Sequence, residues 1–139
     1  MTPLTYMHLP PGSAMRDLSF EGPFFAVVVI EAEVGAAWRD DVARWLVQSG
    51  CLYMSAWGMD CSAWDDAVDW ANIEAFEYGD IPDDRFVMTT WHEKDSLADF
   101  FEFCRHTVRH PDVTLGDTLL LHVALHENRE GLSALYAAA

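Results

Sequence analysis

Five residues in three separated stretches are of types that could do chemistry. Cys61 stands at the start of a helical pattern, where a thiol can have its pKa lowered and become a nucleophile. His92, at the end of a later apolar run, could act as the base for that thiol. Asp60, Glu93 and Glu31 add carboxylates next to these positions or at another strand end. Together they are the candidate catalytic residues of a hydrolase or a transferase.

The same residues also have a simpler, structural explanation. Asp60 and two further aspartates in the following helix would disfavour a thiolate, so Cys61 could be an unreactive thiol in a tight turn. Thr90 and Glu93 have the spacing of a helix capping box, and the ring of His92 could bond a backbone carbonyl. Whether the protein is an enzyme therefore stays open at this stage.

A tryptophan offers a different kind of site. Trp70 falls off the apolar stripe of its helix and onto a face with acidic residues, among them Asp66 and Asp69. Because tryptophan is enriched at the centres of protein interfaces, these three residues are the candidate binding residues. The alternative is that Trp70 packs beneath the N-terminal segment or a loop.

Cofactor and metal sites are not expected. His106 and His110 are four residues apart on an expected helix and could face one ligand, but no third metal ligand accompanies them. The turn EAEVGAAW, residues 31 to 38, has one glycine and two carboxylates, whereas a phosphate site needs several glycines. We therefore predict no cofactor and no metal, and disfavour a nucleotide-binding enzyme.

The charge of the chain narrows the choice of partner. The 139 residues include 23 acids and eight Lys and Arg, giving a formal charge of −15. Nucleic acids and anionic membranes are therefore poor partners, whereas a basic protein fits. The charge could equally serve only solubility. Three cysteines form no disulfide framework, and no secretory signal opens the chain, so we expect a cytoplasmic protein.

Strand and helix patterns alternate along the chain. FFAVVVIEA, residues 24 to 32, has the continuous apolar character of a strand buried on both faces. Further expected strands are 51–57, 86–91 and 118–125. Helices are expected from 36 to 49, from Ser62, which can cap its helix with Asp65 in capping-box spacing, and from Leu97 to Pro111. The order predicts a single-domain α/β sandwich, with a mainly parallel sheet of about four strands, FFAVVVIEA central, and helices on both faces. We assign 1–23 to an N-terminal arm, 24–127 to the α/β domain and 128–139 to a C-terminal tail.

Three stretches carry a resemblance to a known family. AWGMDCSAWDDAVDWANIEAF, GDIPDDRFVMTTWHEKDSL and TLLLHVA resemble an uncharacterised family of small acidic bacterial α/β proteins, classed as a domain of unknown function. The resemblance covers roughly residues 20 to 125. It implies bacterial origin and a compact α/β domain, and it carries over no catalytic residue.

Three functions fit these features. The first, which we favour, is a protein-binding module, such as an inhibitor or immunity-like protein that docks a basic partner. The second is a hydrolase or transferase at the carboxyl ends of the strands, where ligands bind in parallel sheets. The third is an oligomerising structural domain without a ligand, which would pair subunits through the arm or the tail.

Overall fold

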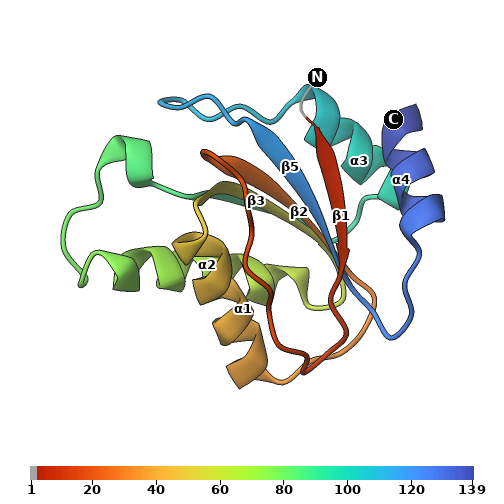
Figure 1. Cartoon of the computed structure of the whole chain (residues 1–139), viewed down its shortest axis with the longest axis horizontal. Helices are drawn as coiled ribbons and strands as arrows, with labels where there is room; N and C mark the ends of the chain where they lie inside the picture. Colours follow the sequence, from red (N-terminus) through yellow and green to blue (C-terminus); the bar gives the residue numbers. More distant parts are fainter. Residues whose placement is uncertain (1–2) are drawn as a thin grey trace.

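The computed structural model describes residues 3–139 and shows one parallel five-stranded sheet, with strand order β1-β5-β2-β3-β4 (Figure 1). The strands are β1 Leu4–His8, β2 Phe24–Ile30, β3 Cys51–Gly58, β4 Met88–His92 and β5 Asp117–Val123. The helices are α1 Ala36–Gln48, α2 Cys61–Ala75, α3 Leu97–His106 and α4 Arg129–Ala138, with a short 3-10 turn at Asp83–Arg85. The expected α/β class is confirmed, with five strands where about four were expected.

Strand β2 is the middle strand of the sheet, as its composition predicts. All seven of its residues are buried, and it pairs in parallel with β5 on one side and β3 on the other. A strand with sheet neighbours on both edges and helices on both faces has no side that meets water, so it can be apolar throughout. The expectation of a central FFAVVVIEA is therefore confirmed.

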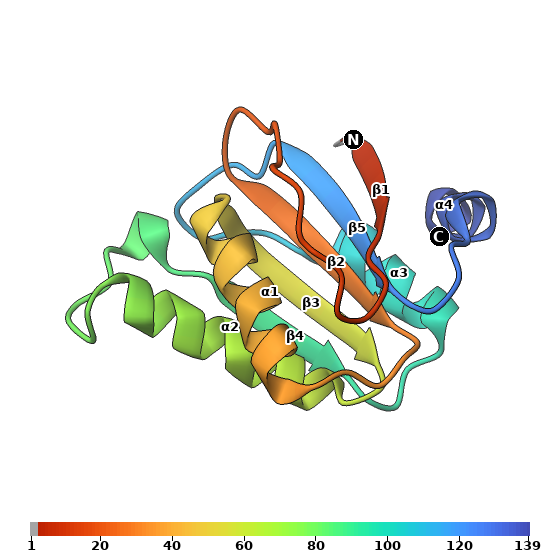
Figure 2. The same ribbon diagram turned by 60° about the horizontal axis from the view of Figure 1, so that its bottom comes forward.

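Helices cover both faces of the sheet (Figure 2). Helices α1 and α2 pack on one face over a core that includes Leu46, Trp64 and Val28. Helices α3 and α4 pack on the other face, where Phe100 and Tyr136 belong to a second core. Within residues 3–139, no helix combines the length and the apolar composition that crossing a bilayer requires.

The N-terminal segment contributes a strand that the sequence did not predict. Residues 4–8 form β1, which pairs with β5 from Leu4 opposite Thr118 to His8 opposite His122. The chain then crosses the α1 side, where the indole N–H of Trp38 donates to the carbonyl of Ser13 at 2.8 Å. Part of the expected surface arm is therefore an edge of the sheet.

Two helix starts also differ from expectation. Helix α2 begins at Cys61 after Asp60, which has a left-handed φ of 54° and makes no side-chain cap, so the expected capping role of Ser62 is wrong. Thr90 lies inside β4 rather than at a helix start. Helix α3 is capped instead by Ser96, whose hydroxyl accepts a hydrogen bond from the Asp99 N–H at 3.1 Å.

Candidate functional site

The carboxyl ends of β2 and β5 lie side by side, and the chain leaves them toward opposite faces of the sheet, to α1 and α4. Ligands of open α/β sheets bind at such switch points. Here the carboxylate Oε1 of Glu31 lies 2.5 Å from Nε2 of His122, and Nδ1 of His122 lies 2.6 Å from the hydroxyl of Tyr6. The backbone N–H of Asn128 donates to that hydroxyl at 2.8 Å.

With a neutral imidazole, one arrangement of protons satisfies this chain of contacts. The Tyr6 hydroxyl accepts from Asn128 and donates to Nδ1 of His122, whose Nε2–H donates to Glu31. Burial raises the pKa of Tyr6, which keeps its hydroxyl protonated as a donor. His122 is 1% exposed and the Glu31 side chain 46% exposed. Only the carboxylate can therefore meet a ligand, and the buried contacts tie β1, β5 and the segment before α4 together.

His92 belongs to a separate cluster at the end of β4. Its Nδ1 lies 2.8 Å from Oδ2 of Asp95, and its Nε2 lies 3.0 Å from the hydroxyl of Thr90. The ring also packs on Phe100 and Phe103 of α3, at centroid distances of 4.9 and 4.5 Å. Strand β3 lies between this cluster and the end of β2. The structure thus does not bring His92 into the hydrogen-bond chain that starts at Glu31.

Cys61 lies close to His92 in space, but its thiol contacts the backbone of His92 rather than the imidazole ring. The Cys61 thiol is buried on the α1 and α2 side, while the His92 ring packs on the α3 side. Burial raises the pKa of the Cys61 thiol, and hydrogen bonding with the backbone of His92 only partly opposes this rise. The expected nucleophile–base pair of Cys61 and His92 is therefore not formed. Asp60 and Glu93, the sequence neighbours of these two residues, are exposed carboxylates.

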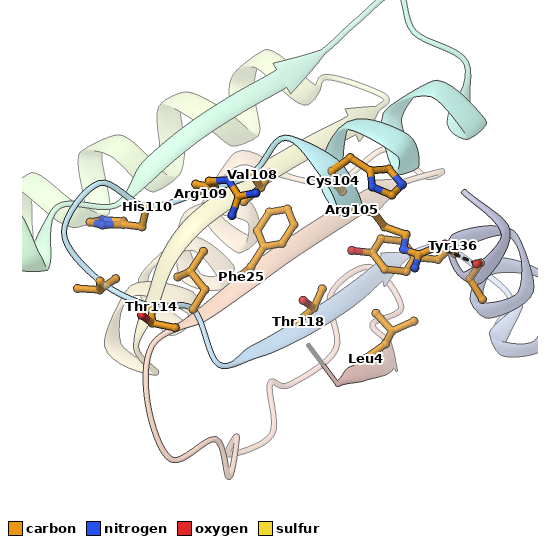
Figure 3. A pocket seen from close by; sticks show the side chains of 14 residues that line it. Leu4, Phe25, Cys104, Arg105, Val108, Arg109, His110, Thr114, Thr118 and Tyr136 are labelled. Atoms are coloured by element: carbon orange, nitrogen blue, oxygen red, sulfur yellow. Dashed lines mark hydrogen bonds between the residues drawn. The ribbon is translucent and has the colours of Figure 1, made fainter. Parts of the chain in front are cut away.

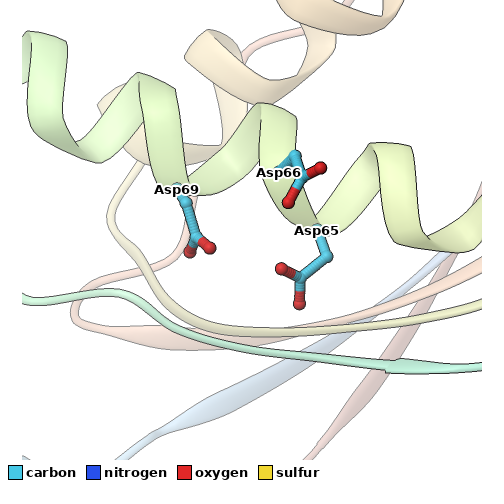
Figure 4. A group of neighbouring side chains, drawn as sticks. All are labelled: Asp65, Asp66 and Asp69. Atoms are coloured by element: carbon cyan, nitrogen blue, oxygen red, sulfur yellow. The ribbon is translucent and has the colours of Figure 1, made fainter.

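Three aspartates on α2 place their carboxylates close together. The carboxylates of Asp65, Asp66 and Asp69 place ligand atoms within 4.8 Å of one another (Figure 4), and among residues 3–139 they are the one group that could hold a metal ion. Asp69 also accepts a hydrogen bond from the Thr89 hydroxyl at 2.8 Å.

Asp65 is the unusual member of the group. It is 4% exposed, and its Oδ2 atom has no hydrogen-bond partner in the described part of the chain. Burial and the charge of Asp69 raise the pKa of Asp65 to about 6, and burial also raises the pKa of Asp69. Two neighbouring carboxylates in this position can share a proton or attract a cation.

Trp70 stands on the outer side of the same helix. Its indole is 62% exposed, and Asp66, one helical turn earlier, is exposed as well. Asp69 is half-buried and turns toward β4 through its bond to Thr89. Its carboxylate still lies within 4.8 Å of that of Asp66, but it is less accessible to a partner than the other two candidate binding residues. Residues 60 to 84 contain nine acidic residues and no Lys or Arg, which makes this the acidic segment of the molecule.

Comparison with known families identifies the chain's relatives. The model of the family described as Domain of unknown function (DUF7684) matches residues 4–139. The chain belongs to the DUF7684 family. The resemblance to a domain of unknown function is thereby confirmed and extends beyond residues 20 to 125 at both ends. Comparisons with curated proteins and with solved structures found no match.

Sequence reasoning missed several site residues of this DUF7684 protein. Tyr6 and His122 are 116 positions apart, and their contact depends on the unpredicted strand β1. The available signal was the single histidine inside TLLLHVAL, because one polar residue in a buried strand must find a partner there. The sequence predicts Asp65 as a capping residue and as a charge near Cys61, although its position next to the apolar stripe of α2 also indicates burial.

Proposed function

We propose that this DUF7684 protein is a cytoplasmic binding module that docks a basic protein partner on the outer face of α2. The observation that carries the proposal is the exposure of Trp70, a residue that is 62% accessible in the middle of a well-packed helix. An isolated apolar residue at the surface needs no explanation, but a tryptophan among acids has the composition of an interface centre.

The charge around Trp70 supports a basic partner. Asp66 is exposed one helical turn before Trp70. Glu77 is exposed just beyond the end of α2, where its left-handed φ of 54° takes it out of the helical pattern. Glu74 is already paired with Arg44, with 3.0 Å between Oε2 and the guanidinium Nε. The remaining acids of residues 60–84 would attract a basic surface over distances of about a Debye length and speed its association.

Helix α2 is a rigid platform for such an interface. Its inner face buries Trp64, Val68 and Ala71 in the core beneath α1 and over the sheet. A side chain on a helix that is already fixed loses little backbone freedom on binding, so more of its contact energy contributes to affinity. The contacts of Cys61 and His92 also favour this function over a hydrolase or transferase, because the thiol pKa is raised and the imidazole nitrogens already have partners.

The test compares two exposed tryptophans. Trp91, on the edge strand β4, is 51% exposed and lies outside α2, so Trp91→Ala is the matched control for Trp70→Ala. In affinity purification we expect a basic protein that wild type and Trp91→Ala retain and Trp70→Ala loses. With that protein purified, Trp70→Ala should weaken binding by about 2 kcal/mol or more in calorimetry. Retention of the same proteins by both variants would contradict the proposal.

A second measurement separates binding from folding. Because Trp70 is exposed, Trp70→Ala should shift the melting temperature by no more than a few degrees. Trp64→Ala, which empties a fully buried site, should cost roughly 3–5 kcal/mol of unfolding free energy. A large loss of stability in Trp70→Ala would assign this residue to the core rather than to an interface.

A further inference from the structure

A cavity of about 780 Å³ opens on the α3 and α4 side, at the end of the sheet where the strands begin (Figure 3). Its lining comes from the first residues of β1, β2 and β5, the end of α3 with the segment that follows it, and the end of α4. This volume lies in the range of small-molecule sites in proteins. The cavity lies at the opposite end of the strands from their carboxyl ends, where the sequence placed the candidate catalytic residues.

The charge of the lining is opposite to that of the molecule. None of the fourteen lining residues is Asp or Glu, although 23 of the 139 residues of the chain are. Four of the fourteen are basic or histidine: Arg105, His106, Arg109 and His110. In a chain of formal charge −15, this concave surface is therefore a local positive region.

Two of these four side chains have structural partners. Arg105 donates to the carbonyls of Ala137 and Ala139 at 2.7 and 2.8 Å, and so satisfies the last turn of α4. His110 is buried, with Nε2 2.8 Å from the carbonyl of Phe86 and Nδ1 accepting from the Asp112 N–H at 3.1 Å. Because their hydrogen bonds are to the protein itself, Arg105 and His110 shape the cavity wall and are not the groups that we expect to bind a ligand.

Arg109 is the cation that the fold leaves available. It follows the end of α3, is exposed, and makes no hydrogen bond or ion pair within residues 3–139. It lines the cavity together with Phe25 and Tyr136, and all three side chains are labelled in Figure 3. His106, also exposed, has a single contact of 3.3 Å to the Ala139 carbonyl and stands at the same opening.

The rest of the lining is mainly apolar. Leu4, Phe25, Val108 and Leu115 line the space between the sheet and the segment after α3. Burial raises the pKa of Tyr136, so its hydroxyl stays neutral beside them. A ligand that fills this cavity would therefore have an apolar body and one negative end.

We infer that this cavity binds a small organic monocarboxylate whose apolar body lies on Phe25 and Leu4 and whose carboxylate pairs with Arg109. The planar guanidinium matches a carboxylate with two parallel hydrogen bonds. The end of α3 lies at the same opening, and the partial negative charge of its carbonyls disfavours a dianion such as a phosphate ester. The inference is independent of the docking function, because it concerns the other face of the sheet.

The test uses octanoate as the probe and octanamide as its neutral analogue, with binding followed by NMR on isotope-labelled full-length protein. Octanoate should bind with a Kd of about 1 mM, given the affinity per atom typical of small ligands. Its shifts should map to the lining residues, and octanamide should bind at least about tenfold more weakly. Equal binding of the two probes, or octanoate shifts elsewhere on the surface, would overturn the inference.

Two kinds of variant test the charge of Arg109 and the volume of the cavity separately. Arg109→Gln should raise the Kd of octanoate at least about tenfold and leave that of octanamide unchanged, whereas Arg16→Gln, another exposed arginine far along the chain, should change neither. Thr114→Trp, which places a bulky ring on an exposed part of the lining, should weaken both probes. An Arg109→Gln protein that keeps its native spectrum and still binds octanoate as wild type does would refute the assignment of Arg109.

Discussion

Two histidines at the carboxyl ends of the strands are each held by a carboxylate, and in both the second nitrogen is also engaged. His122 lies between Glu31 and Tyr6, and His92 lies between Asp95 and Thr90. A catalytic base needs a nitrogen that can reach a substrate proton. Here each ring instead links backbone segments, so neither histidine has a nitrogen left for a substrate proton.

Asp65 provides a test of the aspartate cluster through the pH dependence of stability. Its pKa is about 6 in the folded protein, against about 3.9 for an ordinary aspartate, so the folded state holds the proton more tightly. The unfolding free energy should therefore fall as pH rises from about 4 to about 6, by roughly 2–3 kcal/mol, and stay low above pH 6. Asp65→Asn removes this penalty and should raise the melting temperature more at pH 7.5 than at pH 4.

The control for this prediction is Asp17→Asn, at an exposed position outside α2, because the charge of Asp66 itself adds to the rise in the pKa of Asp65. It removes the same charge at an exposed site, so its effect should be small at both pH values. Equal effects of the two substitutions at pH 7.5 would show that total charge, rather than the buried position of Asp65, sets the penalty.

Thiol chemistry gives a second prediction at the scale of single residues. Cys51, Cys61 and Cys104 are all free and buried, and burial raises the pKa of each, to about 12 for Cys51. A thiol reagent such as DTNB at pH 7.5 should therefore react with the folded protein far more slowly than with free cysteine. In denaturant all three thiols should react promptly. If one thiol per molecule reacted fast in the native state, Cys61 would again be a candidate nucleophile, and the enzyme alternative would be supported.

At the scale of the elements, the sequence predicts best what depends on burial alone. Strand β2 is apolar at every position because both of its faces are covered, and this pattern is visible in one short window. Strand β1 has five residues at the sheet edge, with prolines at positions 3 and 10. Such a short, partly polar segment looks like a loop, since its strand conformation is fixed by pairing with β5 more than a hundred residues away.

The turn between β3 and α2 shows why helix starts are harder to predict than strands. The sequence offers Ser62 as a cap, but the backbone geometry of the turn decides the start of α2. Gly58 has a φ of +108°, and a Cβ added there would lie 2.1 Å from the carbonyl oxygen of Ile30. Met59 N–H then donates to the same carbonyl at 2.9 Å. These contacts join the end of β3 to Ile30 of β2, so the sequence around Ser62 alone does not predict them.

Gly58→Ala should therefore be one of the most damaging small substitutions in the chain. It combines an unfavourable φ with a collision against the backbone of the central strand, which cannot move aside. We expect a loss of roughly 2–4 kcal/mol in chemical unfolding. Gly22→Ala is the control, since Gly22 is exposed, has no positive φ and has nothing within 4 Å of its added Cβ. Similar unfolding midpoints for the two variants would contradict this explanation.

At the scale of the whole molecule, the two proposed binding surfaces differ in charge and lie on opposite faces of the sheet. The acidic segment of residues 60–84 includes α2 on one face, and the acid-free cavity lies beneath α3 and α4 on the other. Helical periodicity was enough to predict that Trp70 leaves the apolar stripe. The cavity could not be predicted, because its lining joins residues from β1 to α4.

The excess of negative charge should also set how salt affects stability. At a formal charge of −15, repulsion among acids is stronger in the compact state than in the unfolded chain. Raising NaCl from about 20 mM to about 300 mM shortens the Debye length from roughly 20 Å to roughly 6 Å, which screens this repulsion. We therefore expect the melting temperature to rise by several degrees, because exposed ion pairs such as Arg44–Glu74 contribute little that salt could remove.

Charge variants test whether the acidic segment is the origin of this effect. The double substitution Glu77→Gln and Asp80→Asn removes two exposed acids, so it should raise the melting temperature at low salt and reduce its salt dependence. Lys94→Gln removes an exposed cation and should do the opposite. Thermal unfolding of the three proteins across the same NaCl series measures both effects. If salt lowered the melting temperature of the wild type instead, ion pairs would outweigh repulsion, and the acidic surface would cost the fold nothing in the absence of a partner.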